Sequence, residues 1–122
     1  MTVKNKLPRQ LKGIPFNLEH LLNYQKESVV SREIVRNASG TMTVFAFDKN
    51  QGLSEHTAPF DATVYILDGE AKISIESKTH LIKKHQMIIM PAGKPHSLKA
   101  VKRFKMLLIL IKESHSRAQT AI

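Results

Sequence analysis

The part of the chain that follows Ser28 is a series of short apolar and β-branched segments, each ended by turn-forming residues. This pattern is typical of a β-sandwich or β-barrel, because strands in such folds are short and regularly interrupted. We expect strands over residues 28–36, 41–48, 62–67, 70–76, 79–83, 86–90, 96–101 and 104–111. Asp68 and Gly69 separate two of these segments, and since glycine tolerates the positive φ of a tight reversal, the dipeptide predicts a β-hairpin.

The segment that precedes these strands favours one short helix. Asn17 is a residue type that often caps helix N-termini, and the leucines at 18, 21 and 22 recur at helical spacing, which predicts a helix near residues 17–25. A chain of 122 residues has room for one domain with a single hydrophobic core. We therefore expect one all-β domain over residues 1–122. Its parts are a basic N-terminal segment at 1–15, a barrel at 28–111 and a C-terminal tail at 112–122.

The formal net charge of +9 raises the question of nucleic-acid binding, which depends on where the charge lies. Residues 13–98 hold nine basic and nine acidic residues, so the excess belongs to residues 1–12 and 99–122. We interpret both ends as solvated termini, with nonspecific binding of polyanions as the alternative. The sequence contains neither an arginine-rich repeat nor a recognition-helix pattern, so we expect no specific nucleic-acid partner.

No apolar run approaches the length of about 20 residues that a membrane-spanning helix needs. The longest run, residues 106–111, is ended by Lys112. The N-terminus lacks the apolar segment of a secretory signal, and the chain has no cysteine. These features favour a cytoplasmic protein without a membrane partner, in which any metal site would have to use His, Asp or Glu.

Two segments resemble the sequence motifs of the cupin superfamily. Residues 52–70, GLSEHTAPFDATVYILDGE, are similar to the first motif, in which a Gly leads to His-x-His, then a Glu and a final Gly. Residues 85–96, HQMIIMPAGKPH, are similar to the second motif, in which Pro-x-Gly-x-x-His closes a strand-turn-strand unit. The resemblance is to a small single-domain cupin and covers about residues 28–111. It implies a double-stranded β-helix closed as a jelly-roll barrel, with a functional pocket inside.

The chain departs from the first motif at the positions that bind metal in the family. The second His of the motif falls on Ala58, and the Glu falls on Ala62. His56 and His96 keep the positions of the first and last metal histidines. Since a divalent metal such as Zn, Ni, Fe or Mn prefers at least three protein ligands, the resemblance implies a degenerate or weak metal site.

We expect the pocket to include one extended row of residues, because side chains two apart share a face of a strand. The candidate pocket residues are His56, Ala58, Phe60, Ala62, Met90 and His96. A third metal ligand would have to be Asp61 or Glu55, turned inward by a bulge. The remaining histidines are interpreted as surface or turn residues: His20, His80, His85 and His115.

Two classes of function are open for such a pocket. The first is a module that binds a small organic ligand. The second is a small enzyme of the isomerase, decarboxylase or dioxygenase type, which uses a metal or the histidines alone. An imidazole titrates near pH ~6.5, so His56 or His96 could act as a general acid or base. Because cupins host both classes, the sequence leaves the choice and the identity of the ligand open.

The last predicted strand, residues 104–111, is apolar on both of its faces. One face holds Phe104, Met106, Leu108 and Leu110, and the other holds Leu107, Ile109 and Ile111. A small barrel has one interior, so the second face needs another cover. A homodimer interface of the kind common among cupins would supply this cover, and we therefore expect a homodimer.

Overall fold

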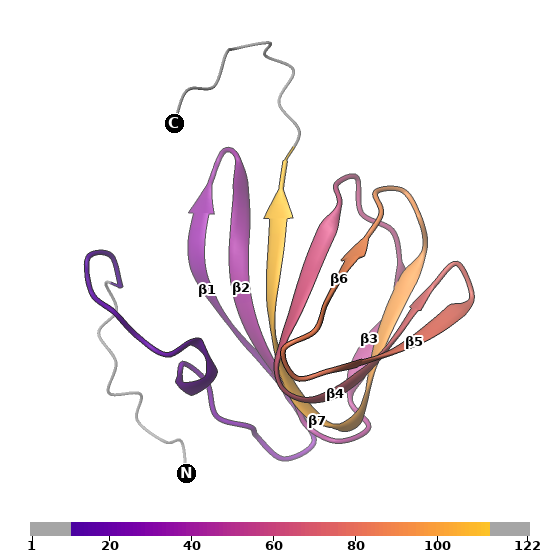
Figure 1. Ribbon diagram of the computed structural model, residues 1–122, viewed down its shortest axis with the longest axis horizontal. Coiled ribbons are helices and arrows are strands. Elements are labelled where there is room, and N and C mark those ends of the chain that lie inside the picture. The colour runs from indigo at the N-terminus through magenta and orange to yellow at the C-terminus, as the bar shows by residue number, and fades with distance from the viewer. Residues whose placement is uncertain (1–10, 113–122) are drawn as a thin grey trace.

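The computed structural model describes residues 11–112, which form seven strands and one 3-10 turn (Figure 1). In chain order they are η1 (Leu18–His20), β1 (Val29–Asn37), β2 (Gly40–Phe47), β3 (Gly52–His56), β4 (Ala62–Ile75), β5 (Lys78–Lys83), β6 (Met87–Met90) and β7 (His96–Ile111). Within this range no helix is long and apolar enough to cross a membrane. The chain is therefore an all-β fold, as the alternating sequence pattern predicts.

Two long antiparallel strands, β4 and β7, run through both walls of the barrel. Their register extends from Ala62 opposite Leu110 to Ile75 opposite His96. The first half of β4 also pairs with β6, and the second half pairs with β5. The wall that contains β6 continues from the second half of β7 to β2 and then β1. The wall that contains β5 continues from the first half of β7 to β3. This arrangement is the double-stranded β-helix that the cupin resemblance implies.

The predicted hairpin at Asp68 and Gly69 is wrong, because both residues lie inside β4. At this point the register of β4 against β7 shifts, and Gly69 has φ +77°. A Cβ atom at Gly69 would lie 1.8 Å from the carbonyl oxygen of Arg103, so the glycine permits a close crossing of two bent strands. Residues 62–67 and 70–76 therefore belong to one strand, as do residues 96–101 and 104–111.

Alternate side chains of the two walls fill the barrel with apolar groups. The rings of Phe47 and Phe104 stack with centroids 4.4 Å apart and an interplanar angle of 8°. The buried side chains around them come from β4, β5, β6 and β7: Ala62, Val64, Ile66, Ala71, Ile73, Ile82, Met90, Leu98, Ala100 and Met106. Burial of one face of each strand explains why the period of two in the sequence predicts most strands correctly.

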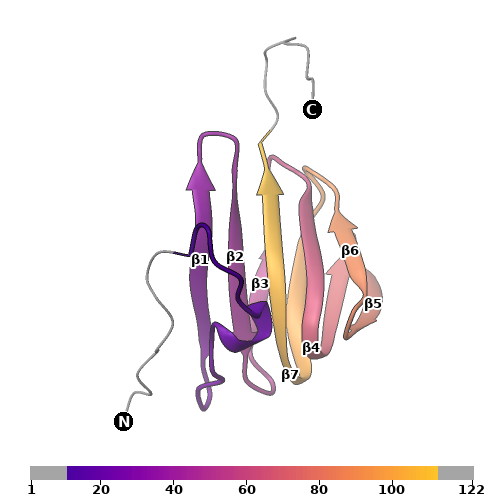
Figure 2. The same cartoon turned by 60° about the vertical axis from the view of Figure 1, so that its left-hand side comes forward.

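The N-terminal segment lies across the outer face of the wall that contains β2, β4 and β7 (Figure 2). Leu21 is 2% exposed and packs with Val44, Leu67 and Leu107. The helix predicted over residues 17–25 is reduced to the 3-10 turn at Leu18–His20, and the side chain of Asn17 makes no capping hydrogen bond. Contacts with the sheet hold the leucines in place, together with a hydrogen bond from the amide of Leu21 to the carbonyl of Leu18 at 3.1 Å.

Polar contacts anchor this segment to the point where β4 and β7 bend. The hydroxyl of Tyr24 donates a hydrogen bond to Oδ2 of Asp68 at 2.5 Å. The guanidinium of Arg103 lies 4.3 Å from the centre of the Tyr24 ring. Nζ of Lys105 donates to the carbonyl of Glu19 at 2.6 Å. Burial, together with the Asp68 carboxylate, raises the pKa of Tyr24, so the phenol stays protonated as the donor.

The basic residues that follow Leu98 belong largely to the barrel and not to a solvated end. They are Lys99, Lys102, Arg103 and Lys105 on β7, and Lys112 directly after it. The interpretation of residues 99–122 as a basic terminus is therefore wrong for residues 99–112. Residues 1–10 and 113–122 lie outside the described range.

Replacement of Leu21 by alanine is expected to lower the free energy of unfolding by about 2–5 kcal/mol, because it removes a buried side chain and leaves a cavity. Leu81→Ala is the matched control, since Leu81 is 49% exposed. Urea denaturation of both variants measures the difference. Equal, small losses would show that the N-terminal segment adds little to the core.

Candidate functional site

Two loops lie side by side at the end of the barrel where β3 and β6 finish. Residues 57–61 connect β3 to β4, and residues 91–95 connect β6 to β7. The amide of Gly93 donates to the carbonyl of Ala58 at 2.8 Å, and the amide of Ala92 donates to Oδ1 of Asp61 at 2.8 Å. These contacts fix the two cupin-like motifs against each other, and we call this end of the barrel the mouth.

The mouth brings His56 and His96 together, as their motif positions predict. The two residues are partners across β3 and β7, and their rings meet edge to face with centroids 4.5 Å apart. Nδ1 of His56 lies 2.7 Å from the carbonyl of Ser54. A carbonyl only accepts, so this nitrogen carries the hydrogen, and Nε2 of neutral His56 is left with a lone pair.

His96 is buried, with 3% of its surface exposed, and its Nδ1 has no hydrogen-bond partner among residues 11–112. Burial lowers the pKa of His96 below its usual value, and the neighbouring His56 lowers it further. A contact of hydrogen-bond type with the backbone of Lys94 acts in the opposite direction without reversing the shift, and it does not reach hydrogen-bond geometry at Nδ1. His96 is therefore a neutral imidazole near pH 7, with one nitrogen available for a ligand or a water molecule.

The lowered pKa of His96 predicts a loss of stability in acid. As the pH falls below about 6.5, the unfolded chain takes up a proton at this histidine before the folded chain does, which favours unfolding. The contribution of His96 to stability decreases as the pH falls from its pKa in the unfolded chain to its lower pKa in the folded chain. At lower pH this contribution stays constant. In urea denaturation at pH 7 and pH 5, His96→Gln should lose less stability on acidification than the wild type, whereas His20→Gln should behave like the wild type. Identical pH dependence in all three would contradict the assigned environment of His96.

The other predicted pocket residues do not form one strand row with His56. β3 ends at His56, residues 57–61 form a loop, and Ala62 begins β4 on the other wall. The expected alternation through residues 56, 58, 60 and 62 is therefore wrong, because strand geometry does not continue through this loop. Ala62 and Met90 are cross-strand partners, and both are buried inside the barrel.

The residues at the mouth do not fit the divalent metal of the cupin motif. Within residues 11–112, no group of three or more His, Asp or Glu side chains is placed to hold a metal ion. Asp61 is exposed and accepts the hydrogen bond of Ala92, and Glu55 is exposed beside His56 on β3. Ala58 and Ala62 offer only methyl groups where the family has donors. Two histidines alone leave a divalent metal weakly held.

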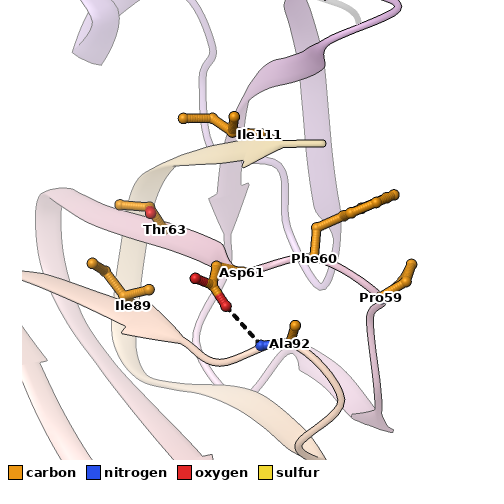
Figure 3. A pocket seen from close by; sticks show the side chains of 7 residues that line it. All are labelled: Pro59, Phe60, Asp61, Thr63, Ile89, Ala92 and Ile111. Carbon is orange, nitrogen blue, oxygen red and sulfur yellow. Dashed lines mark hydrogen bonds between the residues drawn. The ribbon is translucent and has the colours of Figure 1, made fainter. Parts of the chain in front are cut away.

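A hollow of about 390 Å³ lies next to the mouth, on the outer side of the barrel wall (Figure 3). It is lined by Pro59, Phe60, Asp61, Thr63, Ile89, Ala92 and Ile111. Thr63 and Ile89 pair across β4 and β6, and their chain neighbours Ala62 and Met90 point into the barrel. Phe60 is the one predicted pocket residue that lines this hollow, and no sequence motif indicates the hollow itself.

The other histidines within the described range lie away from the mouth pair. His20 is exposed at the end of η1, and His80 is partly buried on β5. His85 occupies the turn before β6 with φ +73°, and its Nδ1 lies 3.1 Å from the hydroxyl of Tyr65. His115 lies outside the described residues.

Comparison with known proteins identifies the family. The family model for the cupin domain matches residues 43–111. A conserved protein of unknown function from Streptococcus pyogenes is 35% identical, with a TM-score of 0.81, over 93% of this chain and 97% of that chain. A cupin 2 conserved barrel domain protein from Leptotrichia buccalis is 40% identical, with a TM-score of 0.77, over 80% of this chain and 47% of that chain.

More distant structures share the fold. A cupin superfamily protein from Desulfitobacterium hafniense is 26% identical, with a TM-score of 0.79, over 93% of this chain and all of that chain. No match was found among curated proteins. The match of the family model over more than half of the chain and the likeness to the Streptococcus protein lead to the same conclusion: this chain is a member of the cupin family.

Proposed function

We propose that this cupin binds a small organic molecule at the barrel mouth through the imidazoles of His56 and His96, without a metal ion. The observation that carries the proposal is the buried, unpartnered Nδ1 of His96. A buried polar atom without a partner costs about 1–3 kcal/mol. Such an atom is therefore a place where a ligand group or a bound water completes the hydrogen bonding.

The two imidazoles suit the recognition of polar groups on an organic molecule. With Nδ1 of His56 bonded to the carbonyl of Ser54, Nε2 of His56 accepts hydrogen bonds. The ring of His56 is exposed and packs against the buried ring of His96. A ligand at the mouth can therefore contact the exposed ring of His56 and the neighbouring ring of His96 together.

A second candidate function is metal-free acid–base catalysis at the same histidines. It is favoured by the neutral state of His96, because a buried, uncharged imidazole next to a second imidazole can accept and return a proton. The cupin fold by itself does not indicate which reaction a protein catalyses. KdgF from Halomonas and a salicylate 1,2-dioxygenase from Pseudaminobacter are 14% and 12% identical to this chain, a likeness of fold alone.

The proposed function is tested by nuclear magnetic resonance of the histidine side chains during a screen of small organic molecules. Ligands of the mouth are expected to shift the imidazole signals of His56 and His96, and to lose affinity in His56→Ala and His96→Ala. His20→Ala is the matched control and should bind as the wild type does. The proposal would be contradicted by ligands that shift the signals of residues in the outer hollow instead and that bind the two mouth variants as tightly as the wild type.

We further infer that the protein is a homodimer that uses the outer face beside the hollow. The N-terminal segment already covers Leu107, so part of the expected cover comes from the chain itself. Ile89 on β6 remains 55% exposed, and Ile111 on β7 remains 70% exposed. Exposed apolar side chains of this kind are favourable to bury against a second copy.

Light scattering is expected to give about twice the chain mass of 13.8 kDa for the wild type. Ile89→Lys should yield monomer or aggregate, because it places a charge in a desolvated interface. Leu81→Lys is the control, since Leu81 is exposed on the other wall. A clean wild-type monomer at micromolar concentration would contradict the dimer.

A further inference from the structure

One wall of the barrel is made by β3, β5 and the adjoining halves of β4 and β7. The N-terminal segment covers the other wall, and within residues 11–112 this wall keeps an uncovered outer face. On β4, Ala71 and Ile73 are buried, so Lys72 between them points outward. On β7, Leu98 and Ala100 are buried, so Lys99 also points outward. We call this outer surface the lysine face. Its residues are Glu70, Lys72, Ser74, Thr79, Leu81, Lys83, Ser97, Lys99 and Val101.

The strand register places the two central lysines directly opposite each other. Lys72 pairs with Lys99 across β4 and β7, and Leu81 lies on the other side of Lys72. Beyond Lys99 stands Gly52 of β3, where a Cβ atom would lie 2.2 Å from the carbonyl oxygen of Leu98, so β3 approaches β7 closely here. The lysines are 27 positions apart in the sequence, so their proximity follows from the pairing alone.

A row of hydroxyl groups lies next to the two lysines. Ser74 pairs with Thr79 on one side and with Ser97 on the other. Oγ of Ser74 and Oγ1 of Thr79 are 3.1 Å apart. Hydroxyls beside ammonium groups supply hydrogen-bond donors to an anion, and carboxylates accept such bonds readily.

The two central lysines make no ion pair within residues 11–112, and Glu70 on the same face lies opposite Lys83. Like charges directly opposite each other on neighbouring strands are destabilising. No ion pair joins Lys72 or Lys99 to a carboxylate of residues 11–112. Glu70, the nearest acid along β4, is paired with Lys102 at 3.9 Å. An external anion would therefore relieve a repulsion that the fold retains.

We propose that the lysine face is an interaction surface for an acidic segment of a partner protein. Two lysines and the hydroxyl row would hold its carboxylates. Leu81 and Val101 flank them at 49% and 42% exposure and would contact its apolar side chains. The face has no aromatic or arginine side chain to stack on bases, so its composition favours a polypeptide over a nucleic acid. This surface lies outside the barrel and does not depend on the mouth site.

The test is a titration of the ¹⁵N-labelled protein with a short peptide of glutamate and leucine residues at low and physiological salt. The peptide is expected to shift amides of β5 and the adjoining halves of β4 and β7, with weaker binding at the higher salt. The double variant Lys72→Gln, Lys99→Gln should bind about three- to thirtyfold more weakly, as expected for the loss of two exposed ion pairs. Its melting temperature should not fall, because the substitutions remove a repulsion.

The matched control is the double variant Lys26→Gln, Lys112→Gln, which loses the same formal charge at exposed positions away from the lysine face. It should keep the wild-type affinity within about twofold. Equal weakening in both double variants would show attraction to the net charge alone and would overturn the proposal. It would also be overturned if the peptide shifted the amide signals of other surfaces. Tighter binding of a single-stranded oligonucleotide of matched charge to the face would overturn it too.

Discussion

Replacement of Phe104 by alanine is expected to lower the free energy of unfolding by about 3–5 kcal/mol. Phe104 is fully buried, and its ring stacks on Phe47 at 4.4 Å. It is also the β7 partner of Gly69, at the point where both long strands bend. Loss of the ring would therefore leave a cavity where the two walls of the barrel meet.

Urea denaturation of Phe104→Ala measures this loss, and Val101→Ala on the same strand is the control, because Val101 is 42% exposed. The control should change stability by less than about 1 kcal/mol. A loss of similar size in both variants would mean that the stacked rings do not form the centre of the core.

The second large effect is the creation of a metal site by Ala58→His together with Ala62→Glu. If both alanines occupy the donor positions of the cupin motif, the variant has three histidines and one carboxylate at the mouth, a donor set for Zn, Ni, Fe or Mn. Without metal, the larger side chains should cost about 1–3 kcal/mol, since Ala62 is buried. With metal at 100 times its dissociation constant, binding should restore about 2.7 kcal/mol.

The affinity of this engineered site should fall below pH ~6.5, because protonated imidazoles do not bind metal. Calorimetric titration with Zn and with Ni at pH 7.5 and pH 5.5 measures both effects. The control carries the same two substitutions with His56→Ala and His96→Ala added, and should not gain affinity. A folded double variant that binds metal no better than the wild type would contradict the assignment of Ala58 and Ala62.

Much of the strand pattern is predictable because one face of each strand is buried. The alternation in ATVYIL and AKISI follows directly from residues that face the core. The Asp68-Gly69 hairpin was wrong because the conformation of Gly69 is decided by a contact with Arg103, far away in the sequence. The strand β3 was missed because GLSEH contains no β-branched residue and only one large apolar side chain.

The candidate site was predictable where it depends on motif spacing and not where it depends on tertiary contacts. The approach of His56 and His96 follows from their places in the two motifs. The loop geometry after His56 could not be read from alternation, because Pro59 and the bonds from Gly93 and Ala92 shape it. The lysine face depends on strand register, which composition and net charge do not give.

The central claim is that the mouth of this cupin holds an organic ligand on two histidines without a metal ion. Its most direct test is elemental analysis combined with native mass spectrometry, on protein produced in metal-supplemented medium and purified without chelators. We expect no stoichiometric Zn, Ni, Fe or Mn bound at the mouth, and the same metal content in the wild type, His56→Ala and His96→Ala. One equivalent of metal per chain in the wild type, lost in both histidine variants, would contradict it.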